Sequence, residues 1–263
     1  MEIIKAHSEE NAVKVIAFAI YFSQKLSNED IDILITKTNE INFFNNEFNS
    51  IENQDEIAVT FTPDGGQSQT QTISGVVCNK LNNKIPEWSL TINKEVVVVT
   101  CREYTWWNEI SLNAYKYITE AFNLTPKDKN ISQITLEYLD EFEILDNNSN
   151  WKELLFKNNS EYITSNIYKL NDFWHINQGC FIKLQNLDKK LLDTIDINYF
   201  SDERDSLKHK VNIRTQHILR YDSNYKYNDE NIKIIFDAIH IHSKDIFEKI
   251  IHDDILNTFN RGE

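Results

Sequence analysis

The sequence is poor in glycine, proline and cysteine, and each shortage excludes a class of structure. Five glycines and three prolines in 263 residues leave little room for long flexible segments. The three cysteines, Cys78, Cys101 and Cys180, are odd in number and far apart, so neither a disulfide framework nor a zinc knuckle is indicated. We expect all three to be buried free thiols.

Long apolar runs and catalytic signatures are also missing. No window approaches the ~20 apolar residues that a membrane span needs, and the first ten residues lack the apolar centre of a signal peptide. We therefore expect a cytoplasmic protein with no membrane association. Gly65-Gly66 lacks the following helix and lysine of a phosphate loop, and no Gly-x-Ser-x-Gly, Cys-His or HExxH pattern is present. No cofactor and no metal site are predicted, and a non-catalytic protein is favoured over an enzyme.

Negative charge is abundant and evenly spread. The net charge is −14, with 11 Lys and Arg against 18 Asp and Glu in residues 1–130, and 16 against 23 in residues 131–263. An acidic surface repels duplex nucleic acid and anionic lipid, because nonspecific affinity for both comes largely from cationic side chains. We therefore expect weak or no direct duplex binding and favour a protein partner, for which a basic surface would be complementary. The sequence leaves the oligomeric state open.

Apolar periodicity predicts the same order of elements in each half of the chain. Val13–Phe22 is typical of a central strand, and Ser27 with Asp30 indicates a capped helix that continues to about Asn45. A four-strand meander follows, with a turn at Pro63-Asp64-Gly65-Gly66, and then a helix from Trp106 that Thr105 caps. The second half reads as a strand at 133–144, a short helix near 151–156, three strands and a terminal helical region at 228–259.

This order predicts an α+β fold made by tandem duplication of a strand-helix-antiparallel meander-helix unit. Helix-grip and TATA-box-binding-protein-like folds share that order. We expect an N-terminal lobe at residues 1–127 and a C-terminal lobe at residues 128–263. The alternative is one continuous α+β domain.

One predicted strand, at residues 207–221, carries a basic strip. Strict alternation places Lys208, Lys210 and Arg214 on one side and His217 with apolar residues on the other. In an acidic protein these cations could bind an anion or an acidic partner. They could equally be a solvated strand face that discourages edge pairing.

Two further groups of residues are candidate functional sites. Asp237 and His240, three residues apart on the terminal helix, share a face and could supply a general base, although a structural histidine at the helix–sheet junction is favoured. Trp106 and Trp107 lie at a strand-to-helix corner. Two adjacent tryptophans cannot both enter one core, so they either form part of a partner-binding surface or attach the helix to the sheet.

The C-terminal segment resembles the end of a sporadically distributed, uncharacterised bacterial protein family of about 250 residues. The resemblance rests on the Asp-x-x-His pattern at 237–240 and the Lys-x-Ile-Phe-Glu pattern at 244–248. It implies a bacterial protein of the kind found near defence or toxin–antitoxin genes, and it carries over no catalytic residue.

The function hypothesis is a non-catalytic binding protein: a sensor, an antitoxin-like protein or an accessory subunit of a bacterial defence or toxin system. The alternative is a hydrolase or nuclease that uses Asp237 and His240, with an anion held by Lys210 and Arg214. A third possibility, a small-ligand carrier, draws only on the helix-grip resemblance.

Overall fold

The computed structural model describes residues 3–61, 67–127, 129–147, 149–185, 187, 189–202 and 205–259. The turn expected at Pro63 to Gly66 lies outside these residues.

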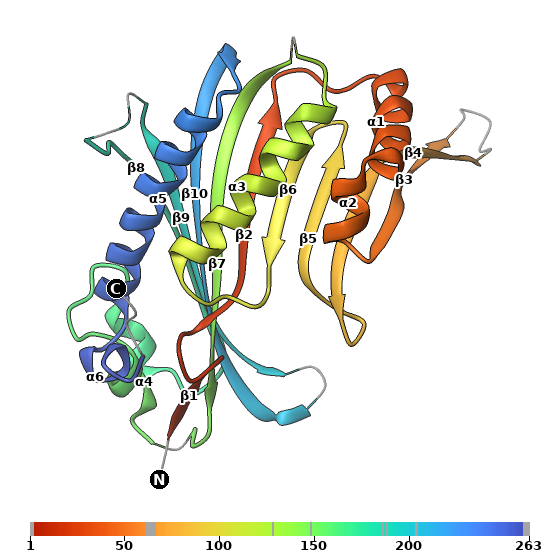
Figure 1. The fold of residues 1–263 in the computed structure, drawn as a ribbon. Helices are drawn as coiled ribbons and strands as arrows, with labels where there is room; N and C mark the ends of the chain where they lie inside the picture. Colours follow the sequence, from red (N-terminus) through yellow and green to blue (C-terminus); the bar gives the residue numbers. More distant parts are fainter. Residues whose placement is uncertain are drawn as a thin grey trace.

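Most described strands belong to one antiparallel sheet that runs through both halves of the chain (Figure 1). The strand order is β3-β4-β5-β6-β2-β7-β10-β9-β8, with β1 paired to the far end of β7. The strands are β1 Ile4–Ala6, β2 Val13–Phe22, β3 Ser50–Phe61, β4 Gln67–Asn82, β5 Ile85–Asn93, β6 Val96–Cys101, β7 Asn130–Ile144, β8 Trp174–Ile182, β9 Leu191–Asp202 and β10 Asp205–Lys226.

The long helices lie over one face of this sheet and leave the other face open (Figure 1). The helices are α1 Asn28–Glu40, α2 Asn42–Glu47, α3 Trp107–Leu124, α4 Trp151–Leu155, the 3₁₀ helix η1 Ser165–Lys169, α5 Asp229–Ile250 and α6 Asp253–Leu256. Within the described part of the chain, no helix combines the length and the apolar character needed to cross a membrane.

The predicted fold class is wrong. A tandem duplication of a helix-grip or TATA-box-binding-protein-like α+β unit would give each half its own sheet, whereas the structure is dominated by one large antiparallel sheet. The physical reason is that β2 and β7, the two apolar central strands, pair with each other from Val13 opposite Asp140 to Phe22 opposite Ile131. Each strand thereby satisfies the backbone edge that a separate lobe would leave exposed. The expected lobe division at residues 127 and 128 stays a prediction.

Local sequence signals in the N-terminal half predict two features correctly and one wrongly. The strand predicted at Val13–Phe22 is confirmed as β2. The capping box is also confirmed: the Asp30 N–H donates to Ser27 Oγ over 3.1 Å, and the Ser27 N–H donates to Asp30 Oδ2 over 2.9 Å. The predicted cap of α3 is wrong, because Trp106 occupies the N-cap position while the Thr105 hydroxyl donates to Glu109.

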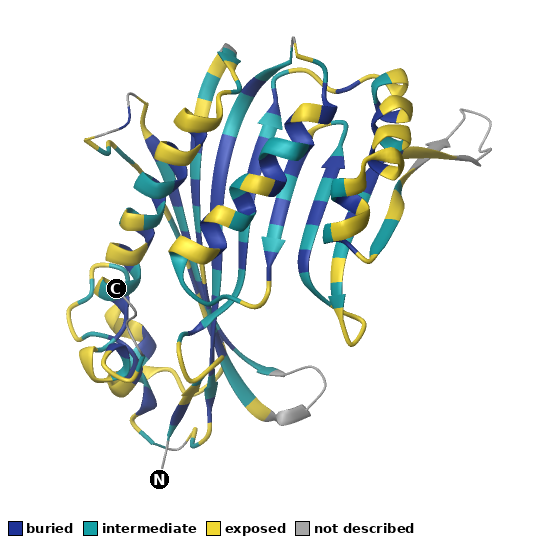
Figure 2. Ribbon diagram, in the orientation of Figure 1, coloured by how far each residue is buried: buried dark blue, intermediate teal, exposed yellow. Residues whose placement is uncertain are grey.

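The buried apolar side chains form two clusters. Buried positions run along the strands beneath the helices and along the helix sides that face the sheet (Figure 2). The larger cluster lies under α1, α3 and the first half of α5, where Ile232, Phe236 and Ile239 are buried. The smaller lies under the second half of α5, where Ile246 and Ile250 are buried, and includes residues of α4 and α6. Helix α5 therefore crosses from one core to the other.

Gly75, in the middle of β4, marks a place where the sheet has no space for a side chain. A Cβ atom at Gly75 would overlap the carbonyl oxygen of Ile92 and lie 2.7 Å from the Cα of Asn93, both backbone atoms of the paired strand β5. We expect Gly75→Ala to lower the free energy of unfolding by ~1–3 kcal/mol or more, since overpacking usually costs that amount. Urea denaturation followed by circular dichroism measures it.

Gly179→Ala is the matched control. Gly179 is also a strand glycine, but its Cβ would meet its nearest neighbour, the Asp193 carbonyl oxygen, at 3.2 Å, and β8 is an edge strand that can shift. A loss at Gly75 no larger than that at Gly179 contradicts this packing explanation.

Candidate functional site

A belt of buried and half-buried polar side chains separates the two apolar clusters. It lies beneath the middle of α5, in the stretch from His240 to Ser243, and its other members come from the neighbouring strands. This polar belt comprises Tyr138, Asp140, Asp193, Thr215, His217, His240, His242 and Ser243. Buried polar groups cost stability unless they are hydrogen-bonded, so the belt is where function is most readily sought.

An aromatic pocket of about 210 Å³ opens on one side of the belt. Its walls come from the corner before α3, from the start of β2, from β7 and from α5. The aromatic members of the lining are Tyr104, Trp106, Trp107, Tyr138, His240, Phe247 and Phe259. The rim is fixed by Asn11, whose side-chain amide donates to the carbonyl oxygen of Tyr104 over 3.1 Å and whose Oδ1 accepts from the Val13 N–H.

Asp140 is the buried acid of this pocket. Alternation along β7 turns it toward the helix-covered face with Tyr138 and Phe142, and only 4% of it is exposed. Within the described part of the chain, no hydrogen bond or ion pair reaches its carboxyl group. Burial raises its pKa from 3.8 to about 8, so it is largely protonated at neutral pH. The pocket thus holds a carboxyl group without a protein partner.

The predicted pair Asp237 and His240 does not act as one unit. Asp237 Oδ1 accepts hydrogen bonds from Trp107 Nε1 and from the Tyr115 hydroxyl, both over 2.9 Å. The His240 ring stacks on Trp107 with centroids 4.0 Å apart, and its Nδ1 lies 2.7 Å from the Tyr138 hydroxyl. Burial, with a contribution from Lys244, lowers the pKa of His240 to about 4. Asp237 therefore fixes the aromatic wall, and neutral His240 forms part of it.

Both tryptophans line the aromatic pocket, and Trp107 also attaches a helix. Trp107 attaches α3 to α5 through its bond to Asp237 and also packs on Phe18, with centroids 5.7 Å apart. Trp106 is half-buried and lines the aromatic pocket.

A second group of belt residues lies on the β9 side of α5. Asp193 Oδ1 is 2.7 Å from His217 Nδ1, and Asp193 Oδ2 is 2.8 Å from His242 Nε2. His217 is fully buried, and its Nε2 has no hydrogen-bond partner among the described residues. Sequence reasoning missed this Asp–His–His cluster, because its members are separated by 24 and 25 positions. The sheet register pairs Asp193 with His217, and the packing of α5 on the sheet adds His242.

The basic strip lies on the opposite, open face of the sheet. Arg214 donates two hydrogen bonds of 2.8 Å to Glu137, and Lys210 donates to Glu141 over 3.3 Å. Lys208 lies 3.9 Å from Glu143. Carboxylates of β7 thus balance all three cations, and the sheet separates them from Asp237 and His240. The arrangement that the hydrolase alternative requires is not brought together.

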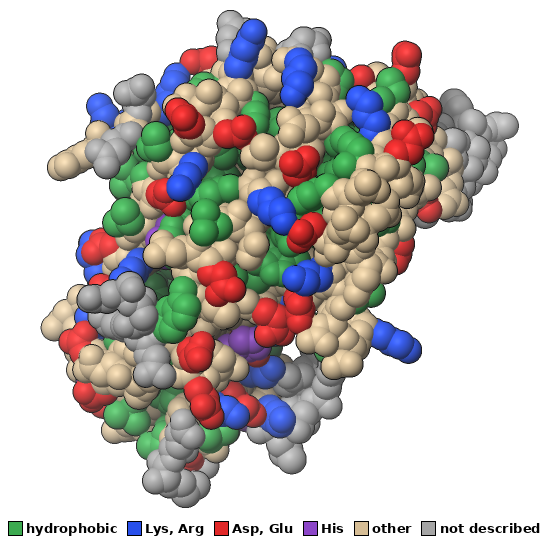
Figure 3. Space-filling view, in the orientation of Figure 1, with side chains coloured by type: hydrophobic (Ala, Val, Ile, Leu, Met, Phe, Trp, Pro, Cys, Tyr) green, Lys and Arg blue, Asp and Glu red, His purple; other side chains and the backbone are tan. Residues whose placement is uncertain are grey.

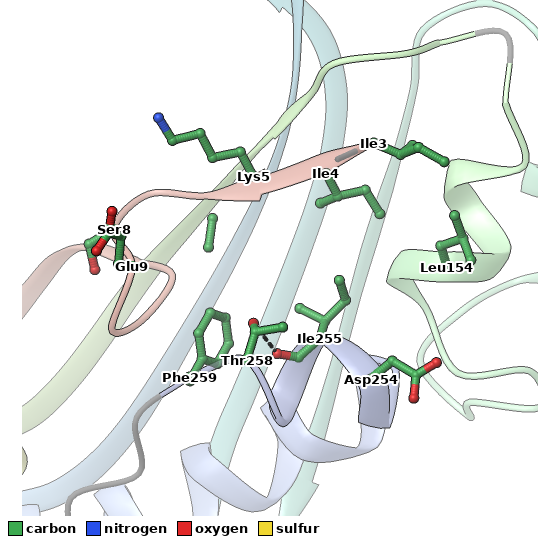
Figure 4. Close-up of a pocket in the computed structure, with 11 residues that line it drawn as sticks. Ile3, Ile4, Lys5, Ser8, Glu9, Leu154, Asp254, Ile255, Thr258 and Phe259 are labelled. Atoms are coloured by element: carbon green, nitrogen blue, oxygen red, sulfur yellow. Dashed lines mark hydrogen bonds between the residues drawn. The ribbon is translucent and has the colours of Figure 1, made fainter. Parts of the chain in front are cut away.

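The thiols and a groove near the start of the chain offer little chemistry. Cys78 and Cys101 are buried as expected, and burial raises the pKa of each thiol to about 12; Cys180 is exposed, so that part of the expectation is wrong. A groove of about 640 Å³ lies between β1 and α6 (Figure 4). Its lining mixes apolar side chains with polar and charged ones, and its Thr258 hydroxyl donates a hydrogen bond to the Ile255 carbonyl oxygen.

No protein-family model matches the chain, and no curated protein matches it. The family resemblance of the C-terminal segment stays a prediction.

Asp140 gives the fold a specific pH dependence. Its folded-state pKa lies above its unfolded-state value, so its contribution to stability is fully present below about pH 4 and is lost as the pH rises through about 8. We expect Asp140→Asn, which keeps the shape and removes the charge, to raise the free energy of unfolding at pH 8 by on the order of 1–3 kcal/mol. At pH 4.5 the gain should be much smaller. Urea denaturation at both pH values measures the difference.

The other titratable groups around the Asp140 carboxyl stay unchanged in this comparison. They are Tyr104 and Tyr138 beneath the pocket, His240 and Lys244 on α5, and Glu10 at the rim. Glu143→Gln, on the open face of the same strand, is the control. A gain from Asp140→Asn that is equal at the two pH values would contradict burial of an uncompensated acid.

Proposed function

We propose that this protein is a non-catalytic binding protein that recruits a basic protein partner and accepts a lysine or arginine side chain of that partner in the aromatic pocket. The setting that we propose is the bacterial cytoplasm, where it would serve as a sensor, an antitoxin-like protein or an accessory subunit of a defence or toxin system.

The observation that carries the proposal is the unpartnered carboxyl group of Asp140 beneath aromatic walls. A cation beside an aromatic face gains electrostatic attraction, up to ~2 kcal/mol when both groups are removed from water. A buried carboxylate also accepts a charge-assisted hydrogen bond. No donor in the described part of the chain makes such a bond to Asp140. An entering ammonium or guanidinium group would favour the ionised form of Asp140, which then releases its proton.

The net charge of −14 supports the same kind of partner. Acidic and basic side chains are interspersed over the helix-covered face (Figure 3), so overall attraction, rather than one large acidic patch, would increase the encounter rate. At the pocket itself Glu10 and Lys244 are opposite in sign, so the charge that would decide binding is the one Asp140 acquires when a cation enters.

The hydrolase or nuclease alternative is less favoured. It needs Asp237 and His240 to meet an anion held by Lys210 and Arg214, but these pairs are on opposite faces of the sheet. The neutralised basic strip also supports the expectation of weak duplex binding, because strong binders make ~6–10 phosphate contacts.

Small cations provide a direct test. We expect n-butylammonium and butylguanidinium to quench the fluorescence of Trp106, with affinity in the ~mM range expected of such small ligands. Asp140→Asn should weaken binding at least ~tenfold, which is ~1.4 kcal/mol. Calorimetry at pH 7 in buffers of different ionisation enthalpy should detect up to about one proton released per cation. The variant Trp106→Phe should lose this quenching, which would assign the fluorescence change to Trp106.

Peptides identify the source of the cation. A short lysine-rich peptide should bind more tightly than butylammonium, and more weakly as salt rises, because screening reduces attraction between exposed charges. The same peptide with acetylated lysines should not bind. Binding of free amines without any gain from the peptide would point to a small-ligand carrier, and equal affinity of wild type and Asp140→Asn would overturn the pocket assignment.

A further inference from the structure

The Asp–His–His cluster is positioned by the backbone of three separate elements. Asp193 on β9 and His217 on β10 are directly opposite each other in the sheet register, so their side chains stand next to each other on the helix-covered face. His242 reaches the same point from α5. One donor atom from each residue lies within 4.8 Å of the other two.

Core packing does not explain why these residues occupy this place. Asp193 and His217 are at most 2% exposed, in a layer where neighbouring strands carry isoleucine, leucine and valine. Whichever neutral tautomer His217 adopts, one nitrogen of its buried ring lacks a partner in the described structure. An apolar side chain would avoid that cost. Buried polar atoms without a hydrogen-bond partner are expected mainly where function requires the residue.

Catalysis by this cluster is also poorly supported, because none of its three residues lines the aromatic pocket or the groove between β1 and α6. A substrate in either hollow would not reach them.

We propose that Asp193, His217 and His242 form a binding site for a divalent transition metal ion, with zinc as the best fit. Two imidazoles and one carboxylate are a ligand set that zinc accepts, with the fourth position left for water. Bonds of ~2.0–2.1 Å place tetrahedral ligand atoms about 3.4 Å apart. The 2.7 and 2.8 Å contacts, each made by a different oxygen of Asp193, would lengthen by well under 1 Å. The more widely spaced donor atoms, which lie within 4.8 Å of one another, would move closer together. A divalent ion would also compensate the buried charge of Asp193.

The ion would join β9 and β10 to α5 at the level where neither apolar core reaches. Its role in this proposal is structural, because none of the three ligands lines the aromatic pocket or the groove, where a substrate could reach the ion. The proposal is independent of the partner-binding pocket, and either can fail without the other.

The test uses the untagged full chain after dialysis against a chelator. Zinc titration by calorimetry should give one ion per chain with submicromolar affinity, and cobalt(II) should give the visible spectrum of a tetrahedral site. Zinc should also raise the melting temperature, because it binds only the folded state. We expect His242→Gln, which changes the least buried ligand, to weaken zinc binding at least ~tenfold. Loss of a residue that only orients a ligand already costs about that much, and loss of the ligand itself should cost no less. Asp193→Asn should do the same.

His252→Gln, a histidine outside the cluster, is the matched control and should bind zinc like the wild type. Circular dichroism verifies that each variant is folded. Absence of zinc binding to the folded wild type at tens of micromolar metal would overturn the proposal. Stoichiometric binding that His242→Gln and Asp193→Asn leave unchanged would overturn it too, because the ion would then lie elsewhere.

Discussion

The pairing of β2 with β7 is the constraint on which the rest of this structure depends. It joins two meanders into one sheet and places all the long helices on the same face. Helix α5 must then cover strands that carry two different apolar clusters, and it has polar residues where it passes between them. The polar belt is the result, and both candidate sites are parts of it. The aromatic pocket opens toward α3, and the Asp–His–His cluster lies toward β9.

The two candidate sites satisfy their buried charges differently. Asp193 is ionised because two imidazoles contact it, and its pKa is lowered although burial opposes ionisation. Asp140 has no such neighbours, so burial dominates and the acid holds its proton. Identical side chains in the same polar belt therefore offer different chemistry: one is a preassembled anionic ligand, and the other ionises when a cation arrives.

Much of the local structure could be predicted from the sequence, whereas its assembly could not. The apolar run of β2 and the Ser27 capping box depend on neighbours within a few residues, and the alternation in β10 correctly separated Arg214 from His217. The β2–β7 pairing depends on register between distant segments, and the contact of Asp193 with His242 depends on how α5 packs on the sheet, neither of which a local pattern encodes. Asp140 is an intermediate case. Alternation along its predicted strand already placed a carboxylate among inward-facing apolar residues, and that signal was available from the sequence.

The central position of β2 has a consequence for the order of assembly during synthesis. Its apolar strand leaves the ribosome early, and β6 can cover one edge as soon as the first meander is made. The other edge waits for β7, whose partner residues follow more than 100 positions later. Until then β2 presents an unpaired, strongly apolar edge of the kind that templates aggregation. The interval between synthesis of β2 and synthesis of β7 is therefore the period in which this chain is most exposed to misassembly.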